Sequence, residues 1–405
     1  MKHVAIIGAG LAGLSCAFAL KRKGIRSTVF ESNPNGIKRD QAALFFLSPD
    51  LFRNTFQLIR DVGLGDDIIS IPPHAAQVYR GRIYHHRVAS ATGLLSFKGL
   101  GITDKALLPR MAYLLDRHSS HLDFHHPERG LEFDDESVAA FIKRELSQNV
   151  LNYIAGPLIS TLFYFGSEET SRLLYFVLAK HMYNTRMSTL RGGIKSLRVR
   201  LSAELQTENH EVRSLQEEGN EYLVDGRRFS DVVVAVPGTS VLSISGIERL
   251  LSGADIEFFR NCVYQRTVSV TVSTRSPVDR NCYAVSIPRV EGFAAATIAF
   301  HNFIDPSTVP DERGLLTITG GGPSVTPDQL LEELGRLYPI EPDAIDVLEC
   351  RAGMPKFPPG RYGQIDAFQR RQRQTGLFFC GDYLLGPFVE GAVTTGLRAA
   401  EAIRT

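Results

Sequence analysis

The stretch VAIIGAGLAG, residues 4–13, decides the fold of this chain. Its first four residues form a short apolar run that suits a buried parallel strand, and the remainder is a Gly-x-Gly-x-x-Gly motif. An apolar helical pattern follows and ends in the basic residues 21–23 and Gly24, a common way for a helix to stop. A second apolar run at 27–30 leads into Glu31, 18 residues after the motif. Strand, glycine turn, helix, strand and acid in this order predict a Rossmann-like unit that binds a dinucleotide.

Each part of this unit has a physical role. The first glycine permits the tight turn, the second lets backbone N–H groups approach the diphosphate, and the third lets the helix pack closely on the strand. The positive end of the helix dipole favours the phosphates, and the carboxylate can accept hydrogen bonds from ribose hydroxyls. The motif alone does not distinguish NAD from FAD. The residues expected to contact the dinucleotide are Gly8, Gly10, Leu11, Ala12, Gly13 and Glu31.

The other end of the chain carries a complementary pattern. An apolar strand at 377–380 runs into Gly381 and Asp382, and a short loop leads to VEGA at 389–392 and a helix that reaches Ile403. A strand that ends in Gly-Asp offers a carboxylate to a sugar or polyol chain. A helix that begins near VEGA directs its N–H groups toward an electron-rich ring oxygen. The small residues of this helix predict that another element packs very close to it.

Taken together, the two ends resemble the flavin-containing amine oxidase superfamily, which includes protoporphyrinogen oxidases and carotenoid-type desaturases. The string FCGD at 379–382, followed by VEGA at 389–392, is similar to the second FAD motif of that family. The resemblance implies bound FAD. It also implies that Asp382 holds the ribityl chain and that the backbone of Val389, Gly391 and Ala392 faces the isoalloxazine ring.

Segments from the middle of the chain add to the resemblance. Two segments are similar to elements that return the family's chain to its FAD domain, LRGGI at 190–194 and the run 231–237. The resemblance also implies that Val212 lies in a nearby strand and that its backbone meets the adenine. The family's Gly-Gly-Arg is replaced by NGIKRD at 35–40, which leaves Arg39 either at the diphosphate or in a solvated loop. Some relatives carry a lysine near flavin N5. The matching stretch here has none, so Arg266 is either a catalytic stand-in or a structural arginine.

The predicted fold class is α/β, with an α+β second domain. A Rossmann-like FAD-binding domain is expected from the discontinuous segments 1–75, 186–245 and 346–405. The segments 76–185 and 246–345 are expected to form a substrate domain with a sheet and helices. Phe163, Tyr164, Phe165, Tyr175 and Phe176 either line its pocket or belong to its core.

Composition excludes several classes of protein. Lys+Arg 45 against Asp+Glu 44 gives a net charge of +1, so general nucleic-acid binding is not expected. The five scattered cysteines, without C-x-x-C, indicate a reducing compartment and predict a cytoplasmic location. No transmembrane segment is expected, since no run of ~20 apolar residues occurs; peripheral membrane contact stays open. Histidines at 85–86 and 118–126 lack a Cys or Glu at a ligand spacing, so no metal site is predicted.

The predicted function is that of an FAD-dependent oxidoreductase with noncovalent cofactor. It would take a hydride equivalent from a C–N or C–C bond of an organic small molecule, largely apolar or aromatic. The alternatives are a redox-neutral flavin isomerase or mutase, a flavin monooxygenase and a non-catalytic FAD-bound protein. The sequence predicts neither the substrate nor the oligomeric state.

Overall fold

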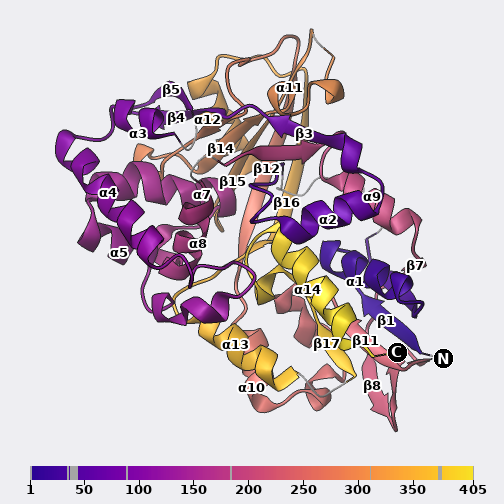
Figure 1. Cartoon of the computed structure of the whole chain (residues 1–405). Helices are drawn as coiled ribbons and strands as arrows, with labels where there is room; N and C mark the ends of the chain where they lie inside the picture. The colour runs from indigo at the N-terminus through magenta and orange to yellow at the C-terminus, as the bar shows by residue number, and fades with distance from the viewer. Residues whose placement is uncertain are drawn as a thin grey trace.

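The computed structural model describes residues 2–33, 36, 44–87, 90–182, 185–310, 312–372 and 376–404, without the side chains of residues 91 and 92. Two large sheets organise this part of the chain, one of five strands and one of seven. The smaller sheet lies near both ends of the chain, and the larger sheet lies beside a lobe of helices from the first half (Figure 1).

The five-stranded sheet is parallel throughout and has the order β17-β11-β1-β2-β7. Its strands are β1 (His3–Ile7), β2 (Arg26–Glu31), β7 (Thr207–Asn209), β11 (Asp231–Val234) and β17 (Leu377–Phe379). In β1 every residue from Val4 to Ile7 is buried, as expected for a parallel strand that is covered on both faces. The predicted strands of the Rossmann-like unit are therefore confirmed.

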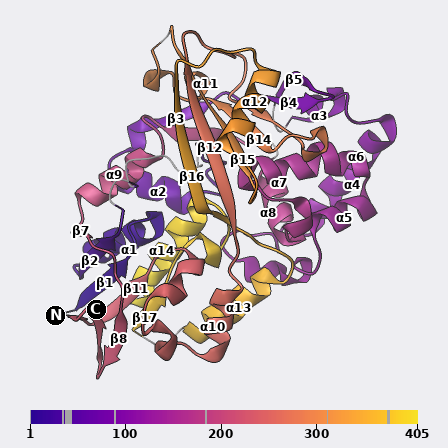
Figure 2. The ribbon, with the colours of Figure 1, turned by 180° about the vertical axis from the view of Figure 1, so that it is seen from behind.

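The first and last helices pack against each other beside this sheet. They are α1 (Leu11–Arg22) and α14 (Val389–Ala402), and they lie side by side in both ribbon views (Figure 1, Figure 2). A Cβ atom on Gly396 would lie 2.1 Å from the carbonyl oxygen of Ala12, and one on Gly13 would lie 2.0 Å from that of Gly8. Only glycine permits these approaches, and the close packing predicted for the small-residue helix is confirmed.

The seven-stranded sheet has the order β16-β12-β15-β14-β13-β4-β5 and is antiparallel except between β13 and β4. Its strands are β4 (His74–Tyr79), β5 (Arg82–Arg87), β12 (Tyr264–Thr274), β13 (Ala284–Ser286), β14 (Ala295–Phe300), β15 (Gly314–Gly321) and β16 (Ala344–Pro355). Residues 346–355, predicted to belong to the FAD-binding domain, thus lie in a strand of this second sheet.

Helices cover the two faces of the larger sheet unequally. On one face, α12 (Pro327–Leu337) packs Leu330 and Leu334 into a separate apolar core with β12, β14 and β15. On the other side lies the lobe of helices (Figure 2). The lobe contains α3 (Ala91–Ser96), α4 (Ile102–Arg117), α5 (Val138–Glu145), α6 (Gln148–Val150), α7 (Gly156–Phe163) and α8 (Arg172–Met182).

The remaining elements connect these parts. The helices are α2 (Arg53–Asp61), α9 (Lys195–Ala203), α10 (Gly253–Arg260), α11 (His301–Ile304) and α13 (Arg361–Arg371). The strands are β3 (Ile68–Ile71) paired with β6 (Met187–Leu190), and the ladder of β8 (Leu215–Glu218), β9 (Glu221–Val224) and β10 (Arg227–Phe229). Among the described helices, none combines the length and the apolar character needed to cross a bilayer.

Candidate functional site

The glycine turn after β1 forms one end of the site. Gly8 has φ +110°, and its N–H donates to the carbonyl of Phe30 at 2.8 Å. A Cβ on Gly10 would meet no protein atom within 4 Å, so this stretch of backbone is open for a ligand to approach. Gly10 and Leu11 line a cavity of the protein, whereas the carbonyl of Ala12 faces α14. The turn therefore fits a diphosphate at the start of α1, as the motif predicts.

Glu31 lies beside this turn, at the carboxyl end of β2. Its Oε2 accepts the N–H of Ala9 at 2.9 Å, and its Oε1 accepts the N–H of Asn33 at 2.7 Å. Each oxygen keeps a lone pair after these bonds, so the carboxylate can still accept from ribose hydroxyls. The geometry suits the role predicted for Glu31.

Asp382 places a carboxylate at the cavity after β17. It lines the cavity, and burial raises its pKa to about 7, opposed by hydrogen bonds that include one from the Tyr264 hydroxyl. That hydroxyl also accepts the N–H of Gly238 at 3.1 Å. Beside it, Gly381 donates its N–H to Thr395 Oγ1 at 2.9 Å, which ties β17 to α14. A carboxylate held in this way can accept hydrogen bonds from a polyol chain.

The start of α14 forms the adjacent wall. Phe388, the N-cap residue, lines the cavity together with Val389 and Ala392. Gly391 does not line it. A Cβ on Gly391 would lie 2.3 Å from the carbonyl oxygen of Gly386, so glycine is needed there by the preceding loop. The need for glycine at position 391 therefore comes from the backbone of Gly386, which occupies the space of a Cβ atom, and not from contact with a ring.

Three other predicted residues lie away from the cavity or outside the described part. Arg39 lies outside the described residues. Val212 is in the loop between β7 and β8 rather than in a strand, and it does not line the cavity. Arg266 donates to the carbonyls of Gly322 and Val325 and pairs with Glu349 at 2.7 Å.

These contacts are those of a structural arginine, the second of the two roles left open for Arg266. It precedes Thr267, which lines the cavity together with Ser269 of the same strand. The register of β12 against β16 shifts between Gln265 and Thr267, and Arg266 contacts Val325, which belongs to the apolar core under α12.

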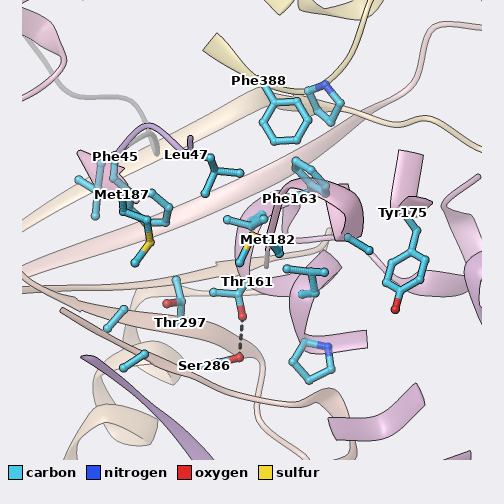
Figure 3. A pocket seen from close by; sticks show the side chains of 18 of the residues that line it. Phe45, Leu47, Thr161, Phe163, Tyr175, Met182, Met187, Ser286, Thr297 and Phe388 are labelled. Atoms are coloured by element: carbon cyan, nitrogen blue, oxygen red, sulfur yellow. Dashed lines mark hydrogen bonds between the residues drawn. The ribbon is translucent and has the colours of Figure 1, made fainter. Parts of the chain in front are cut away.

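The cavity itself extends from the glycine turn to the larger sheet and has a volume of about 950 Å³. Phe45, Leu47 and Met187 gather on one side, with Phe163 and Phe388 beside them (Figure 3). The rings of Phe163 and Phe388 meet edge to face at 5.1 Å.

The sequence did not predict that the larger sheet and α4 line the cavity. Their cavity residues, such as Met111 of α4 and Thr297 of β14, come from distant segments that carry no local motif. Of the five aromatic residues left open, Phe163, Tyr164 and Tyr175 line the cavity, whereas Phe165 and Phe176 belong to the core.

Polar side chains also line the cavity. Thr161 and Ser286 share a hydrogen bond of 2.7 Å between their hydroxyls (Figure 3). Lys180 Nζ donates to the carbonyls of Ser119 at 2.7 Å and Leu122 at 2.9 Å. Among the described lining residues, the charged side chains are Arg87, Asp116, Lys180, Arg198 and Asp382.

Two groups of potential metal ligands come together only in three dimensions. Glu132 joins His118 and His121, and Asp279 and Cys282 join His85, with ligand atoms within 4.8 Å of one another in each group. The spacing in the sequence does not reveal these groups, because Glu132, Asp279 and Cys282 are distant in sequence from the histidines. Asp279 accepts hydrogen bonds from His85 at 2.9 Å and Tyr338 at 3.0 Å, which satisfies that group without an ion. The absence of a metal stays a prediction.

Comparison with known proteins gives matches along the whole chain. The family model "Flavin containing amine oxidoreductase" matches residues 40–404, and a model of an NAD(P)-binding Rossmann-like domain matches residues 6–35. A coproporphyrinogen III oxidase of Staphylococcus aureus (strain NCTC 8325 / PS 47) is 28% identical over 203 residues, which is 47% of this chain and 42% of the relative. This chain thus spans less than half the length of that curated relative in the match.

Solved structures share the fold over nearly their full length. A proposed protoporphyrinogen oxidase from Exiguobacterium sp. 255-15 superimposes with a TM-score of 0.74 at 16% identity, over 99% of this chain and 98% of the other. A cyclohexylamine oxidase from Brevibacterium oxydans IH-35A gives a TM-score of 0.75 at 17% identity, over 99% and 98%. At these identities the likeness establishes the fold.

Proposed function

The chain belongs to the flavin-containing amine oxidoreductase family, and we propose that it is an FAD-dependent oxidoreductase that oxidises a large, mostly apolar molecule bearing carboxylate groups. A porphyrinogen, a ring of four pyrroles with carboxylate side chains, is the substrate class that fits best. The bond oxidised would be a C–N or C–C single bond.

The observation that carries this proposal is the cavity. Its volume of about 950 Å³ includes the space that FAD would occupy beside Gly10, Asp382 and Val389, so the chemistry of the lining carries the argument. Aromatic and aliphatic side chains make up most of its lining. Such a wall favours a large ring system over a small, strongly hydrated amine.

The charges in the cavity support anionic substituents. Arg87, Lys180 and Arg198 supply three cations, and the carboxylates among the described lining residues are Asp116 and Asp382. Two N–H groups of Lys180 bond to carbonyls, which leaves one for a ligand carboxylate. The names of two relatives, a coproporphyrinogen III oxidase and a proposed protoporphyrinogen oxidase, point to the same class.

The protein's part in the reaction is to hold and orient. When bound, FAD supplies the hydride acceptor. The backbone at Gly10 and Leu11 would hold the diphosphate, Glu31 the ribose and Asp382 the ribityl chain, while Val389 would lie at the ring. The apolar walls exclude water from the reacting atoms.

The cofactor is proposed to be noncovalent. Cys350 lines the cavity, and burial raises the pKa of its thiol, which makes it a poor nucleophile. All five cysteines are free, which supports the proposed cytoplasmic location. We also propose two domains built on the two large sheets, with β16 assigned to the substrate domain.

Anaerobic stopped-flow spectroscopy tests the substrate class. Holoenzyme would be mixed with coproporphyrinogen III, with its tetramethyl ester, and with putrescine and cyclohexylamine as controls. Rapid loss of the visible flavin absorption with the free acid, slower with the ester, supports the proposal. Bleaching by the amines alone, or by the ester as fast as by the acid, would refute it.

A further inference from the structure

A buried carboxylate at the start of α14 joins two helices that are distant in sequence. Glu390 is 0% exposed, and its oxygens accept the N–H groups of Asn54 at 3.0 Å and Thr55 at 2.8 Å, at the beginning of α2. The hydroxyls of Thr55 at 2.6 Å and Thr394 at 3.1 Å donate to the same carboxylate. A buried charge is costly unless it is fully paired. The four hydrogen bonds therefore indicate that the surrounding residues are arranged to hold this carboxylate.

His125 completes the network from the helical lobe. Its side chain is 3% exposed, and its Nε2 lies 2.6 Å from Glu390 Oε1. The other ring nitrogen, Nδ1, lies 3.7 Å from Asp123 Oδ1, and the backbone carbonyl of His125 accepts from Arg398. The imidazole thus connects the lobe to α14 through a hydrogen bond to a carboxylate, one of the strong classes of hydrogen bond.

A cluster of aromatic rings lies directly beside this polar network. Phe388 meets Phe52 at 5.9 Å and Phe124 at 5.2 Å, both edge to face. Each ring is one or two residues from a member of the network: Phe52 precedes Asn54, Phe124 precedes His125, and Phe388 precedes Glu390. The same three segments therefore meet twice, once through polar groups and once through rings.

We propose that His125 and Glu390 form a positioning pair that holds Phe388 and the start of α14 against the flavin side of the cavity. Neither residue lines the cavity, so the pair acts through Phe388 and Val389, which do. The inference rests on the FAD site and goes beyond the proposed substrate. It is independent of which molecule is oxidised.

The test uses holoenzyme carrying His125→Leu or His125→Gln, with Glu333→Gln as the matched control. Glu333 is also buried, and it accepts the N–H groups of Ala294 and Ala295 at 2.8 Å each, from α12 on the other side of the sheet. The measurements are the visible flavin spectrum, the midpoint potential of the flavin, the FAD dissociation constant and the melting temperature of the apoprotein. None of them requires a substrate.

His125→Leu should perturb the flavin spectrum, shift the midpoint potential and raise the FAD dissociation constant about tenfold, or ~1.4 kcal/mol. His125→Gln should recover most of this change because its amide can still donate to Glu390. Glu333→Gln should lower the melting temperature and leave the three flavin measurements unchanged. A His125→Leu protein with lower melting temperature but wild-type flavin properties would overturn the proposal, since the pair would then serve the fold alone.

Phe388→Leu keeps the test decisive if His125→Leu does not fold. It removes the ring and leaves the polar network intact, and it should reproduce the shifts in spectrum and potential. Wild-type flavin properties in Phe388→Leu would also overturn the proposal, because the ring would not be the link.

Discussion

The two walls of the cavity differ in how much main chain and how many side chains they present to a ligand. On the FAD-binding side the main chain contributes directly, because Gly10 leaves backbone open to a ligand, and the side chains of Asp382 and Phe388 lie beside it. On the opposite side the wall consists of side chains such as Thr161 of α7 and Met111 of α4. A main-chain wall binds by geometry that any added atom disrupts, whereas a side-chain wall can be reshaped residue by residue. Cofactor binding and substrate choice should therefore respond to different substitutions.

The largest effect is expected at the glycine turn, where two alanine substitutions should fail in different ways. Gly13→Ala would place a Cβ 2.0 Å from the Gly8 carbonyl oxygen and should destabilise the apoprotein by about 1–3 kcal/mol. Gly10→Ala meets no protein atom within 4 Å, so apoprotein stability should stay within about 0.5 kcal/mol of wild type. Its FAD affinity should nevertheless fall at least about tenfold, because the methyl group occupies the ligand's space.

Urea denaturation of the apoproteins and FAD titration separate the two cases. Unchanged FAD affinity in Gly10→Ala would move the diphosphate away from this turn. Unchanged apoprotein stability in Gly13→Ala would contradict the close contact between α1 and the glycine turn after β1.

Glu31 should show the next largest effect. Glu31→Ala removes a carboxylate that accepts two backbone N–H groups and is expected to bind ribose, a loss of ~1.5–3 kcal/mol or roughly ten- to a hundredfold in FAD affinity. Glu31→Gln should lose less because its amide oxygen still accepts. Glu208→Ala on the neighbouring strand β7 is the control, since Glu208 pairs with Arg227 near the surface. Equal FAD dissociation constants for wild type and Glu31→Ala would reject the ribose role.

Asp382 predicts opposite pH dependences for stability and cofactor binding. The pKa of this carboxyl is about 7 in the folded apoprotein against 3.8 as its ordinary value, so the folded state binds the proton more tightly than the unfolded state. Its contribution to stability is present below about pH 4 and is lost as the pH rises through 7. FAD affinity should rise over the same range, because the ionised carboxylate accepts the ribityl hydroxyls better.

Asp382→Asn should flatten both curves. The measurements are apoprotein unfolding and FAD titration across this pH range. A variant that keeps the wild-type slope in FAD affinity would assign the titration to another group.

The smallest effect is expected on the side-chain wall. Thr161→Val removes the hydrogen bond to Ser286, worth about 0.5–1.5 kcal/mol, and should change the substrate KM by a few fold without altering FAD affinity. Thr271→Val is the matched control, because Thr271 forms a similar bond to Thr317 at 2.9 Å and does not line the cavity. A change in FAD affinity in Thr161→Val, with KM unaffected, would contradict the assignment of cofactor binding to one wall and substrate choice to the other.

The difference between the two walls also explains which site residues could be predicted from the sequence. The glycine turn, Glu31 and Asp382 were predicted because a few neighbouring residues carry the whole geometric requirement. The contact that requires glycine at position 391 could not be predicted, because Gly386 comes close only through the path of the loop. Arg266 could not be assigned from sequence, because the direction of its side chain depends on the partners of β12, among them Glu349.

The helical lobe was the least predictable part. Phe163 and Phe165 are two residues apart in one aromatic run, yet only the first lines the cavity. Periodicity predicts that such residues are buried, but it does not say whether they face a ligand or the core. The network around Glu390 is similar, since its members come from three segments of the chain.

The topology of the five-stranded sheet has a consequence for synthesis on the ribosome. Its strand order places β17 against β11, and α14 packs against α1. The first-translated segments of the cofactor domain therefore cannot complete their packing until the last segments have been synthesised. Until residues 377–402 emerge, the apolar strand β11 has an open edge and the glycine face of α1 is uncovered. A nascent chain therefore carries a nearly complete second sheet beside an unfinished cofactor domain, which is the state in which chaperones and proteases would meet it.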